Sequence, residues 1–280
     1  MGTSGAADAT GCLQPPGNPS GKGAALKLEE CRRGEGTAIK HCPARRLCPL
    51  GALCAGGVQA GESPLFPTVV ELEPGELLWA DLRFEQRAFV IQTGIFACIS
   101  NLEQGREIPL ALLGSGHTAG LAELYIPREI ASTYYLRALT GGRACSFPAK
   151  ALRRHLEALP SATVADLLSR TLVNTSSASY AQIKMLSKPL ASDRITMLLA
   201  RLKELAGQEG RDLTQAKLTH SDIATLISSD RVSVTRALHK MEEGGLVELG
   251  YRSLQITEGI DGCEELVEDA KGLFHRPAAE

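Results

Sequence analysis

The chain has 280 residues, of which 44% are hydrophobic, and its 30 Lys and Arg residues nearly balance its 32 Asp and Glu residues. This composition excludes a disordered polypeptide and allows two folded domains, whereas the small net charge neither requires nor excludes nucleic acid as a partner. No apolar run approaches the roughly 20 residues that a membrane helix needs, and residues 1–11 lack the features of a secretory signal. We therefore expect a cytoplasmic protein with no membrane partner.

The first 61 residues are predicted to form a mobile N-terminus followed by a cysteine-rich segment. Residues 1 to about 30 are rich in Gly, Ala, Pro and Ser, and the cysteine-rich stretch runs from Cys31 to Gly57. Five residues separate Cys42 from Cys48 and Cys48 from Cys54, and two of these cysteines precede proline, as in iron–sulfur binding runs. Because cytoplasmic thiols stay reduced, these cysteines indicate metal binding or redox sensing before structural disulfides.

The residues around these cysteines leave several interpretations open. Four thiolates could hold an iron–sulfur cluster or a structural zinc ion, two could form a reversible disulfide, or the cysteines could be inert. Nearby basic residues are expected to favour thiolates; they are Arg32, Arg33, Lys40, Arg45 and Arg46. Cys12 and Cys263 receive no role, and a lone His41 is expected to be exposed.

Residues 62–158 are predicted to form an antiparallel β-roll that serves as the sensor domain. Between Pro67 and Pro148, short apolar runs such as ELEPGELLW and FVIQTGIFACIS alternate with turn signals. Cys98 lies in one apolar run and is expected to be a small core residue. His117 follows another run and is expected in an exposed loop.

Helices are predicted next, first over residues 149–158 and then over residues 159–189, with Ser161 as the N-cap of the second. The second helix has an apolar stripe whose centre is polar, from Asn174 to Ser179. Either the helix lies on its own domain, or the stripe is a dimer seam weakened by polar positions. The candidate dimerisation residues are Leu168, Thr171, Leu172, Thr175, Ile183 and Leu186.

Residues 190–270 are predicted to form a winged helix-turn-helix, whose second helix enters the major groove of DNA. A first helix begins at Ser192 or Asp193. Thr219 or Ser221 then caps a short helix, and Asp230 caps the next one, which runs to about Glu243. LVEL and SLQI, joined by GYR, form the wing. The candidate DNA-contacting residues lie on the second helix of the motif and are Arg231, Val232, Ser233, Thr235, Arg236 and Lys240.

The segment from about residue 40 to residue 260 resembles the Crp–Fnr superfamily of bacterial transcription regulators. ELEPGELLWADLRFEQRAFVIQTGIFACISNLEQGRE resembles the β-roll of that family, and MLSKPLASDRITMLLARLKELA resembles the exit of its dimer helix. The resemblance implies an α+β fold with a cyclic-nucleotide-binding-like jelly roll, a long dimerisation helix and a C-terminal winged helix-turn-helix. It also implies a homodimer on an inverted-repeat operator, with RNA polymerase as a further partner and Arg236 as the guanine-contacting arginine.

The family usually carries a glutamate four positions before that arginine, where this chain has Val232. Glutamate accepts a hydrogen bond from cytosine N4, whereas valine offers methyl groups to a thymine methyl. We therefore predict a half-site shifted toward an A·T pair, TTAAT-like rather than TTGAT-like.

The predicted sensor region, made of the cysteine-rich segment and the β-roll, departs from the cyclic-AMP branch of the family and is similar to its oxygen-sensing Fnr branch. Counted against the cyclic-AMP cassette, Ser132 and Thr133 stand in place of its Arg-Ser pair and Ala122 in place of its Glu, so we expect no cyclic nucleotide. A buried phosphate without its arginine would be an unpaired charge. Cys145 matches the position of the distant cluster ligand in the Fnr branch, although the first gap in that branch is two residues rather than five.

These observations lead to one functional hypothesis and one alternative. We expect a homodimeric regulator switched by oxygen, nitric oxide or redox state through a 4Fe–4S cluster on Cys42, Cys48, Cys54 and Cys145, with Cys31 as an alternative ligand. The alternative is a regulator that senses a small organic effector in the β-roll, with the cysteines forming a thiol/disulfide switch or a structural zinc site. No nucleophile–base pairing, phosphate loop or catalytic metal motif favours an enzyme.

Overall fold

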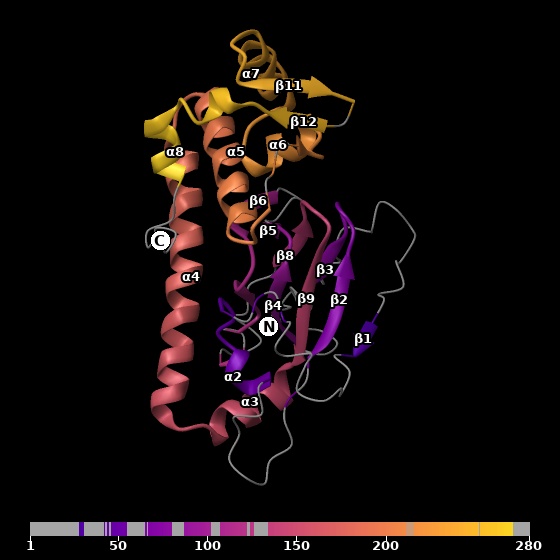
Figure 1. Cartoon of the computed structure of the whole chain (residues 1–280), viewed down its shortest axis with the longest axis vertical. Helices are drawn as coiled ribbons and strands as arrows, with labels where there is room; N and C mark the ends of the chain where they lie inside the picture. The colour runs from indigo at the N-terminus through magenta and orange to yellow at the C-terminus, as the bar shows by residue number, and fades with distance from the viewer. Residues whose placement is uncertain are drawn as a thin grey trace, which may run out of the picture.

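The computed structural model shows a β-roll, a long helix beside it and a helix-turn-helix unit at one end (Figure 1). No helix in the part of the chain that it describes is long and apolar enough to cross a membrane. The described residues are 28–30, 42, 44, 46–54, 65, 67–79, 87–101, 107–121, 124–125, 134–211, 213, 215–251 and 253–270.

The β-roll consists of two antiparallel sheets packed face to face. Apolar side chains of both sheets, including Phe89, Phe96 and Leu136, fill the space between them. The apolar runs of the sequence are the strands that supply this core, and the turn signals lie between the strands. The predicted antiparallel roll is thus confirmed. One sheet has the order β1 (Leu28–Glu30), β2 (Thr68–Leu72), β9 (Gly142–Pro148), β4 (Arg87–Thr93) and β7 (Thr118–Ala119). The other has the order β3 (Leu77–Trp79), β8 (Tyr134–Ala138), β5 (Phe96–Asn101) and β6 (Glu107–Leu113).

Two helices close the lower end of the roll in Figure 1, the four-residue α2 (Gly51–Cys54) and α3 (Ala149–Ala158). Leu50 and Leu53 pack with Leu152 and Leu156 of α3 in one apolar cluster. The described residues 46–54 of the cysteine-rich segment are therefore attached to the roll through Leu50 and Leu53.

The long helix α4 (Ser161–Ser187) runs along the roll, and α5 (Ala191–Gly207) follows it after a short break. The predicted cap of α4 is wrong by one residue: Ser161 is the first helical residue, and the carbonyl of Pro160 accepts the first helical hydrogen bonds. The predicted cap of α5 is also wrong, because Leu190 precedes the helix and Ser192 and Asp193 lie inside its first turn. The N-cap positions of the two helices are occupied by Pro160 and Leu190, and neither makes a side-chain cap hydrogen bond.

Residues 190–270, called the DNA-reading unit after their predicted role, have the expected winged helix-turn-helix architecture. Its apolar interior includes Ile223, Val234 and Leu238, which are completely buried. The wing has a third, two-residue strand that was too short to be predicted from the sequence. The elements in order are β10 (Gln215–Ala216), α6 (His220–Leu226), α7 (Arg231–Glu243), β11 (Val247–Gly250) and β12 (Ser253–Ile256). A turn of 3-10 helix (Glu258–Ile260) and α8 (Glu264–Ala270) follow.

The DNA-reading unit packs directly on the β-roll and is fastened to the long helix. Ile99 and Leu112 of the roll share one apolar cluster with Leu198 and Leu202 of α5. At the break between α4 and α5, the carboxylate of Asp269 on α8 lies 2.8 Å from the amino group of Lys184 and 2.7 Å from that of Lys188. The direction of the DNA-reading unit is thus set by contacts with both neighbours.

Candidate functional site

The two helices of the helix-turn-helix, α6 and α7, begin at side-chain caps that hold their orientation. Asp230 accepts hydrogen bonds from the backbone N and the Oγ of Ser233, at 2.8 and 2.6 Å, and these bonds lower the pKa of the Asp230 carboxyl. Thr219 and Asp222 form a capping box at the start of α6. The prediction of Asp230 as a cap is confirmed, and of the two caps predicted for the first helix, Thr219 is the one used.

The recognition helix α7 presents an exposed face at the top of the molecule in Figure 1. Arg231, Arg236 and Lys240 are exposed, and Val232 is 60% exposed one turn before Arg236. These are the side chains that can reach base edges and phosphates without any change in the fold.

Two of the predicted DNA-contacting residues are half-buried and already bonded inside the unit. The hydroxyl of Ser233 donates to Asp230, and that of Thr235 donates to the carbonyl of Arg231 at 2.9 Å and lies 2.9 Å from Nδ1 of His220. These hydroxyls position α7 in the structure, so we expect phosphate contacts chiefly from Arg231 and Lys240.

Three side chains that sequence reasoning missed tie the helix-turn-helix to its surroundings. The buried amide of Gln182 on α4 donates to the carbonyl of Leu226, the last residue of α6, at 3.0 Å. Arg194 donates to the carbonyl of Ile227 at 3.2 Å, and Arg137 of the β-roll lies 3.7 Å from the carboxylate of Asp222. No local motif predicts these contacts, because each joins residues more than 30 positions apart.

The long helix has two different faces, and each matches one of the two interpretations of its sequence. Ala178, Ala181 and Met185 are buried against the molecule, as expected of a helix that lies on its own domain. The opposite side exposes Leu168 (41%), Leu172 (67%) and Ile183 (64%) to solvent. Of the remaining dimerisation candidates, Thr175 is exposed, and Thr171 and Leu186 are half-buried.

The structure brings the four predicted cysteine ligands into one region at the end of the β-roll. Cys145 on β9 is buried in an apolar cluster, and Cys48 and Cys54 pack against the same cluster. The thiols of Cys54, Cys48 and Cys42 each contribute to raising the pKa of Cys145, so the four side chains lie within electrostatic range of one another. We call these four residues the thiol cluster. Cys31, Cys12 and His41 lie outside the described residues, as do Ala122, Ser132 and Thr133.

Burial, rather than basic neighbours, controls the pKa of two thiols in the cluster, those of Cys48 and Cys145. It raises the pKa of Cys48 to about 11, with a smaller contribution from Cys42, and it also raises the pKa of Cys145. The expectation that nearby basic residues favour thiolates is therefore wrong for these two cysteines. A thiol with so high a pKa is almost entirely protonated at neutral pH and is a weak nucleophile.

The described cysteines contain no disulfide, since all six are thiols; they are Cys42, Cys48, Cys54, Cys98, Cys145 and Cys263. Within the same described residues, no three His, Cys, Asp or Glu side chains are arranged so that they could hold a metal ion. The thiol cluster thus has cysteines of the kind and number that a 4Fe–4S cluster needs, but the described residues do not hold them in a metal-binding arrangement. Cys98 is half-buried on β5 beside the core of the roll.

His117, expected in an exposed loop, is buried, with only 8% of its surface exposed. Burial, and secondarily the positive charge of Arg201, lower the pKa of His117 to about 4. Its Nδ1 lies 3.1 Å from the carbonyl oxygen of Gly114. The prediction is wrong because α5, more than 80 residues further along the chain, covers the turn that carries this histidine.

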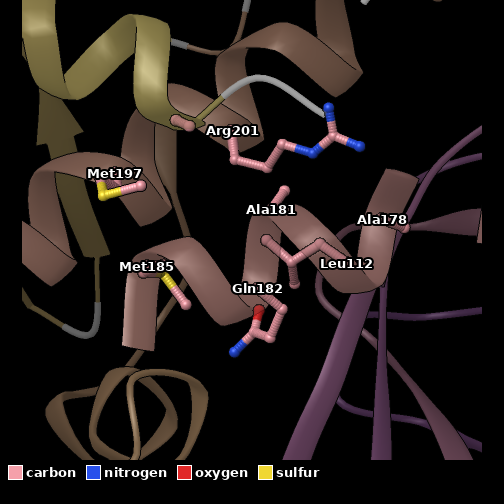
Figure 2. A pocket seen from close by; sticks show the side chains of 8 residues that line it. Leu112, Ala178, Ala181, Gln182, Met185, Met197 and Arg201 are labelled. Carbon is pink, nitrogen blue, oxygen red and sulfur yellow. The ribbon is translucent and has the colours of Figure 1, made fainter. Parts of the chain in front are cut away.

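A cavity lies where α4, α5, α8 and β6 meet, with Gln182 and Arg201 as its polar lining (Figure 2). Most of this space is open to solvent, and the enclosed part has room for about one water molecule. The Nε of Arg201 is buried without a hydrogen-bond partner, although another guanidinium nitrogen pairs with Glu204. The apolar residues that line the cavity are Leu112, Ala178, Ala181, Met185, Met197 and Ala270.

Two domain families match separate parts of the chain. Residues 69–158 match the cyclic nucleotide-binding domain, and residues 193–258 match the Crp-like helix-turn-helix domain. The first match coincides with the β-roll and the second with the DNA-reading unit.

Curated relatives cover most of the chain at low identity. The transcriptional regulator SdrP of Thermus thermophilus is 26% identical over 215 residues, which is 75% of this chain and 92% of the relative. The global nitrogen regulator of Synechococcus elongatus is 24% identical over 207 residues, covering 72% of this chain and 90% of the relative. These relatives are regulators and not enzymes.

Solved structures share the fold. A transcriptional regulator of the Crp/Fnr family from Eubacterium rectale has a TM-score of 0.55 at 22% identity. The match covers 71% of this chain and 89% of the regulator's chain. A CRP-family regulator from Thermus thermophilus has a TM-score of 0.54 at 20% identity and covers 71% of this chain and 96% of its own.

Proposed function

We propose that this chain, a DNA-binding transcription regulator of the Crp–Fnr superfamily, acts as a homodimer whose DNA binding is switched through its thiol cluster. The switch is a 4Fe–4S cluster held by Cys42, Cys48, Cys54 and Cys145 that responds to oxygen, nitric oxide or redox state. The observation that carries this proposal is that one buried cysteine of the β-roll lies among three cysteines from a segment about ninety residues earlier.

The exposed face of α4 supports the homodimer. Leu168, Leu172, Thr175 and Ile183 recur at intervals of three, four and eight residues, and this spacing keeps them on one side of a helix. A second copy of α4 would bury these side chains and place two α7 helices on successive major grooves of an inverted-repeat operator. Arg236 would then contact a guanine in each half-site, while Arg231 and Lys240 contact phosphates.

The thiol cluster fits an iron–sulfur group in the kind and number of its ligands. When bound, such a group supplies a redox-active, oxygen-labile centre. The chain's part is to hold the described residues of 42–54 against the roll: Leu50 and Leu53 contribute apolar contacts, and the four cysteines would bind one shared cluster. Without that cluster only the apolar contacts remain, so docking of the segment depends on the state of the cysteines.

Anaerobic purification of the full chain tests this proposal directly. We expect a brown protein with iron, sulfide and a visible absorption band that disappears in air together with operator binding. Cys145→Ser should remove the band, whereas Cys263→Ser, in a cysteine outside the thiol cluster, should leave it unchanged. A colourless protein with stoichiometric zinc would reject the iron–sulfur switch and favour a structural zinc site.

A second candidate function is regulation by a small organic effector. It is favoured by the match of residues 69–158 to the cyclic nucleotide-binding domain. A Cys42→Ser, Cys48→Ser variant that still bound its operator only together with a small molecule from a cell extract would support this alternative.

A further inference from the structure

The turn Gly114–His117, between β6 and β7, lies between the cysteine-rich segment and the first helix of the DNA-reading unit. We propose that this turn is the mechanical coupling through which docking of residues 44–54 on the β-roll controls the seating of α5 and hence DNA affinity. This inference rests on the proposed function only for the chemical event that moves the segment. The contacts on the two faces of the turn carry the inference itself.

On its first face the turn is in contact with the backbone beside Cys48. Gly116 has a φ of +82°, and a Cβ added to it would lie 2.6 Å from Cβ of Leu47 and 2.7 Å from its carbonyl oxygen. No side chain fits in this space, so glycine is required both for the backbone conformation and for the close approach. The peptide of Leu47, the neighbour of Cys48, therefore rests directly on the turn.

The turn is also fastened to the strand that contacts the fourth thiol. The side-chain amide of Gln92 on β4 donates to Sγ of Cys145 at 2.9 Å, and the carbonyl of Gln92 accepts from Oγ of Ser115 at 2.9 Å. Ile91 donates to the carbonyl of His117 and accepts from the amide of Gly116, both at 2.9 Å. All these groups are buried or lie in the backbone, so the turn and the surroundings of Cys145 shift together or not at all.

On its second face the turn is in contact with α5. A Cβ added to Gly114 would lie 3.1 Å from Cδ2 of Leu205. The ring of His117 is buried, and the positive charge of Arg201 on α5 contributes to lowering its pKa. Leu205 and Arg201 are one turn apart on α5, and α5 in turn packs on the recognition helix α7. A continuous series of contacts therefore leads from the cysteines to α7.

Close-packed interiors do not deform gradually. Displacement of residues 44–54 is therefore expected to change how α5 packs on the turn, instead of being taken up by small local shifts. With residues 44–54 docked, the turn is held on both faces and α5 is fixed, with α7 exposed as the structure shows it. Release of the segment removes one face of the support and weakens the other. Because coupling between two sites is reciprocal, disturbance of the α5 face must also loosen the cysteine-rich segment.

Two alanine substitutions, one on each face, test the coupling in the full-length chain. Gly116→Ala pushes on the cysteine-rich segment, and Gly114→Ala pushes on α5. Gly75→Ala is the matched control, because Gly75 also has a positive φ, +90°, but an added Cβ there meets nothing within 4 Å. Amide hydrogen exchange is read in residues 44–54 and 191–207, and affinity is measured for the duplex that the wild-type chain selects from a random pool.

We expect each variant to speed exchange on the opposite face as well as on its own. We also expect Gly116→Ala to weaken operator binding about tenfold, within the range of typical coupling energies, and Gly75→Ala to change neither quantity. The proposal is overturned if Gly116→Ala speeds exchange only in residues 44–54 and leaves both α5 and operator affinity as in the wild type.

If Gly116→Ala does not fold, Ser115→Ala replaces it, since that change removes only the hydrogen bond to Gln92. The exchange measurement does not require iron, so it separates this inference from the proposed function. A colourless protein that still shows the effect on the opposite face would retain the coupling and reject the iron–sulfur switch. A brown protein without that effect would do the reverse.

Discussion

The DNA-reading unit and the thiol cluster differ in how far apart along the chain their parts lie. Thr219, Asp222 and Asp230 cap helices within a window of twelve residues, and their partners lie three positions away. The thiol cluster, in contrast, joins Cys145 to cysteines about a hundred positions earlier, and the turn Gly114–His117 contacts α5 over a similar separation along the chain. A locally encoded unit can be predicted side chain by side chain, whereas a site assembled over long distances shows only its ingredients in the sequence.

The largest expected effect tests whether the local unit is sufficient for DNA binding. Leu172→Asp places a carboxylate on the exposed face of α4, where a two-fold axis would bring two of them together in a low-dielectric seam. We expect a monomer by analytical ultracentrifugation and a loss of operator affinity of about a hundredfold to ten-thousandfold, because two linked half-site contacts become one.

Ser169→Asp, on an exposed part of the same helix, is the control and should remain a dimer. A Leu172→Asp chain that stayed dimeric would mean that the exposed face of α4 is not the seam. In that case the unit would be paired by some other surface.

The next effect isolates a single base contact. Arg236→Ala should weaken binding to the selected operator by about 1–3 kcal/mol for each half-site and relax selection at the contacted guanine. Lys240→Ala should weaken binding to all duplexes alike and reduce the salt dependence, because a phosphate contact carries no sequence information. Titrations at two salt concentrations distinguish the two patterns, and equal losses on specific and unrelated duplexes for Arg236→Ala would contradict the assignment.

The sequence predicted the β-roll, the long helix and the winged helix-turn-helix, because apolar periodicity and capping residues report on their own neighbourhood. It also named the four cysteines, although only the resemblance to known regulators connected Cys145 with the others. It missed the burial of His117 and the bond from Gln182 to α6, since both depend on elements that fold back from far along the chain. Burial of the thiols was missed for the same reason, and it reversed the expected pKa shift of Cys48.

A smaller effect concerns His117, which sequence reasoning placed on the surface. Its pKa in the folded state is about 4, below the value of 6.5 in an unfolded chain, so the unfolded state binds the proton first as the pH falls. The stability contributed by neutral His117 is complete above about pH 6.5 and is lost as the pH falls toward 4, by about 3 kcal/mol in total.

Urea unfolding at several pH values measures this slope. His117→Gln should have a shallower fall in unfolding free energy between pH 6.5 and 4 than the wild type, whereas His239→Gln, at an exposed position on α7, should keep the wild-type slope. If the unfolding free energies of the wild type and His117→Gln fell in parallel as the pH is lowered, the turn Gly114–His117 would be open to water in solution. The turn would then be less tightly packed than the DNA-reading unit.

The smallest effect concerns sequence preference alone and is confined to α7. Val232 is 60% exposed one turn before Arg236, so its methyl groups can contact a thymine methyl but cannot accept a hydrogen bond from cytosine. We expect the wild-type chain to select TTAAT-like half-sites and Val232→Glu to shift selection toward TTGAT-like ones by about tenfold, which corresponds to roughly 1.4 kcal/mol. Val232→Ala, which loses the methyl contact and gains no acceptor, should show a flatter preference between the two. Selection of an unaltered TTGAT core by the wild type would contradict this reading. Because the preference depends on one side chain of a locally encoded helix, it should also be the same in any cysteine variant that still binds DNA.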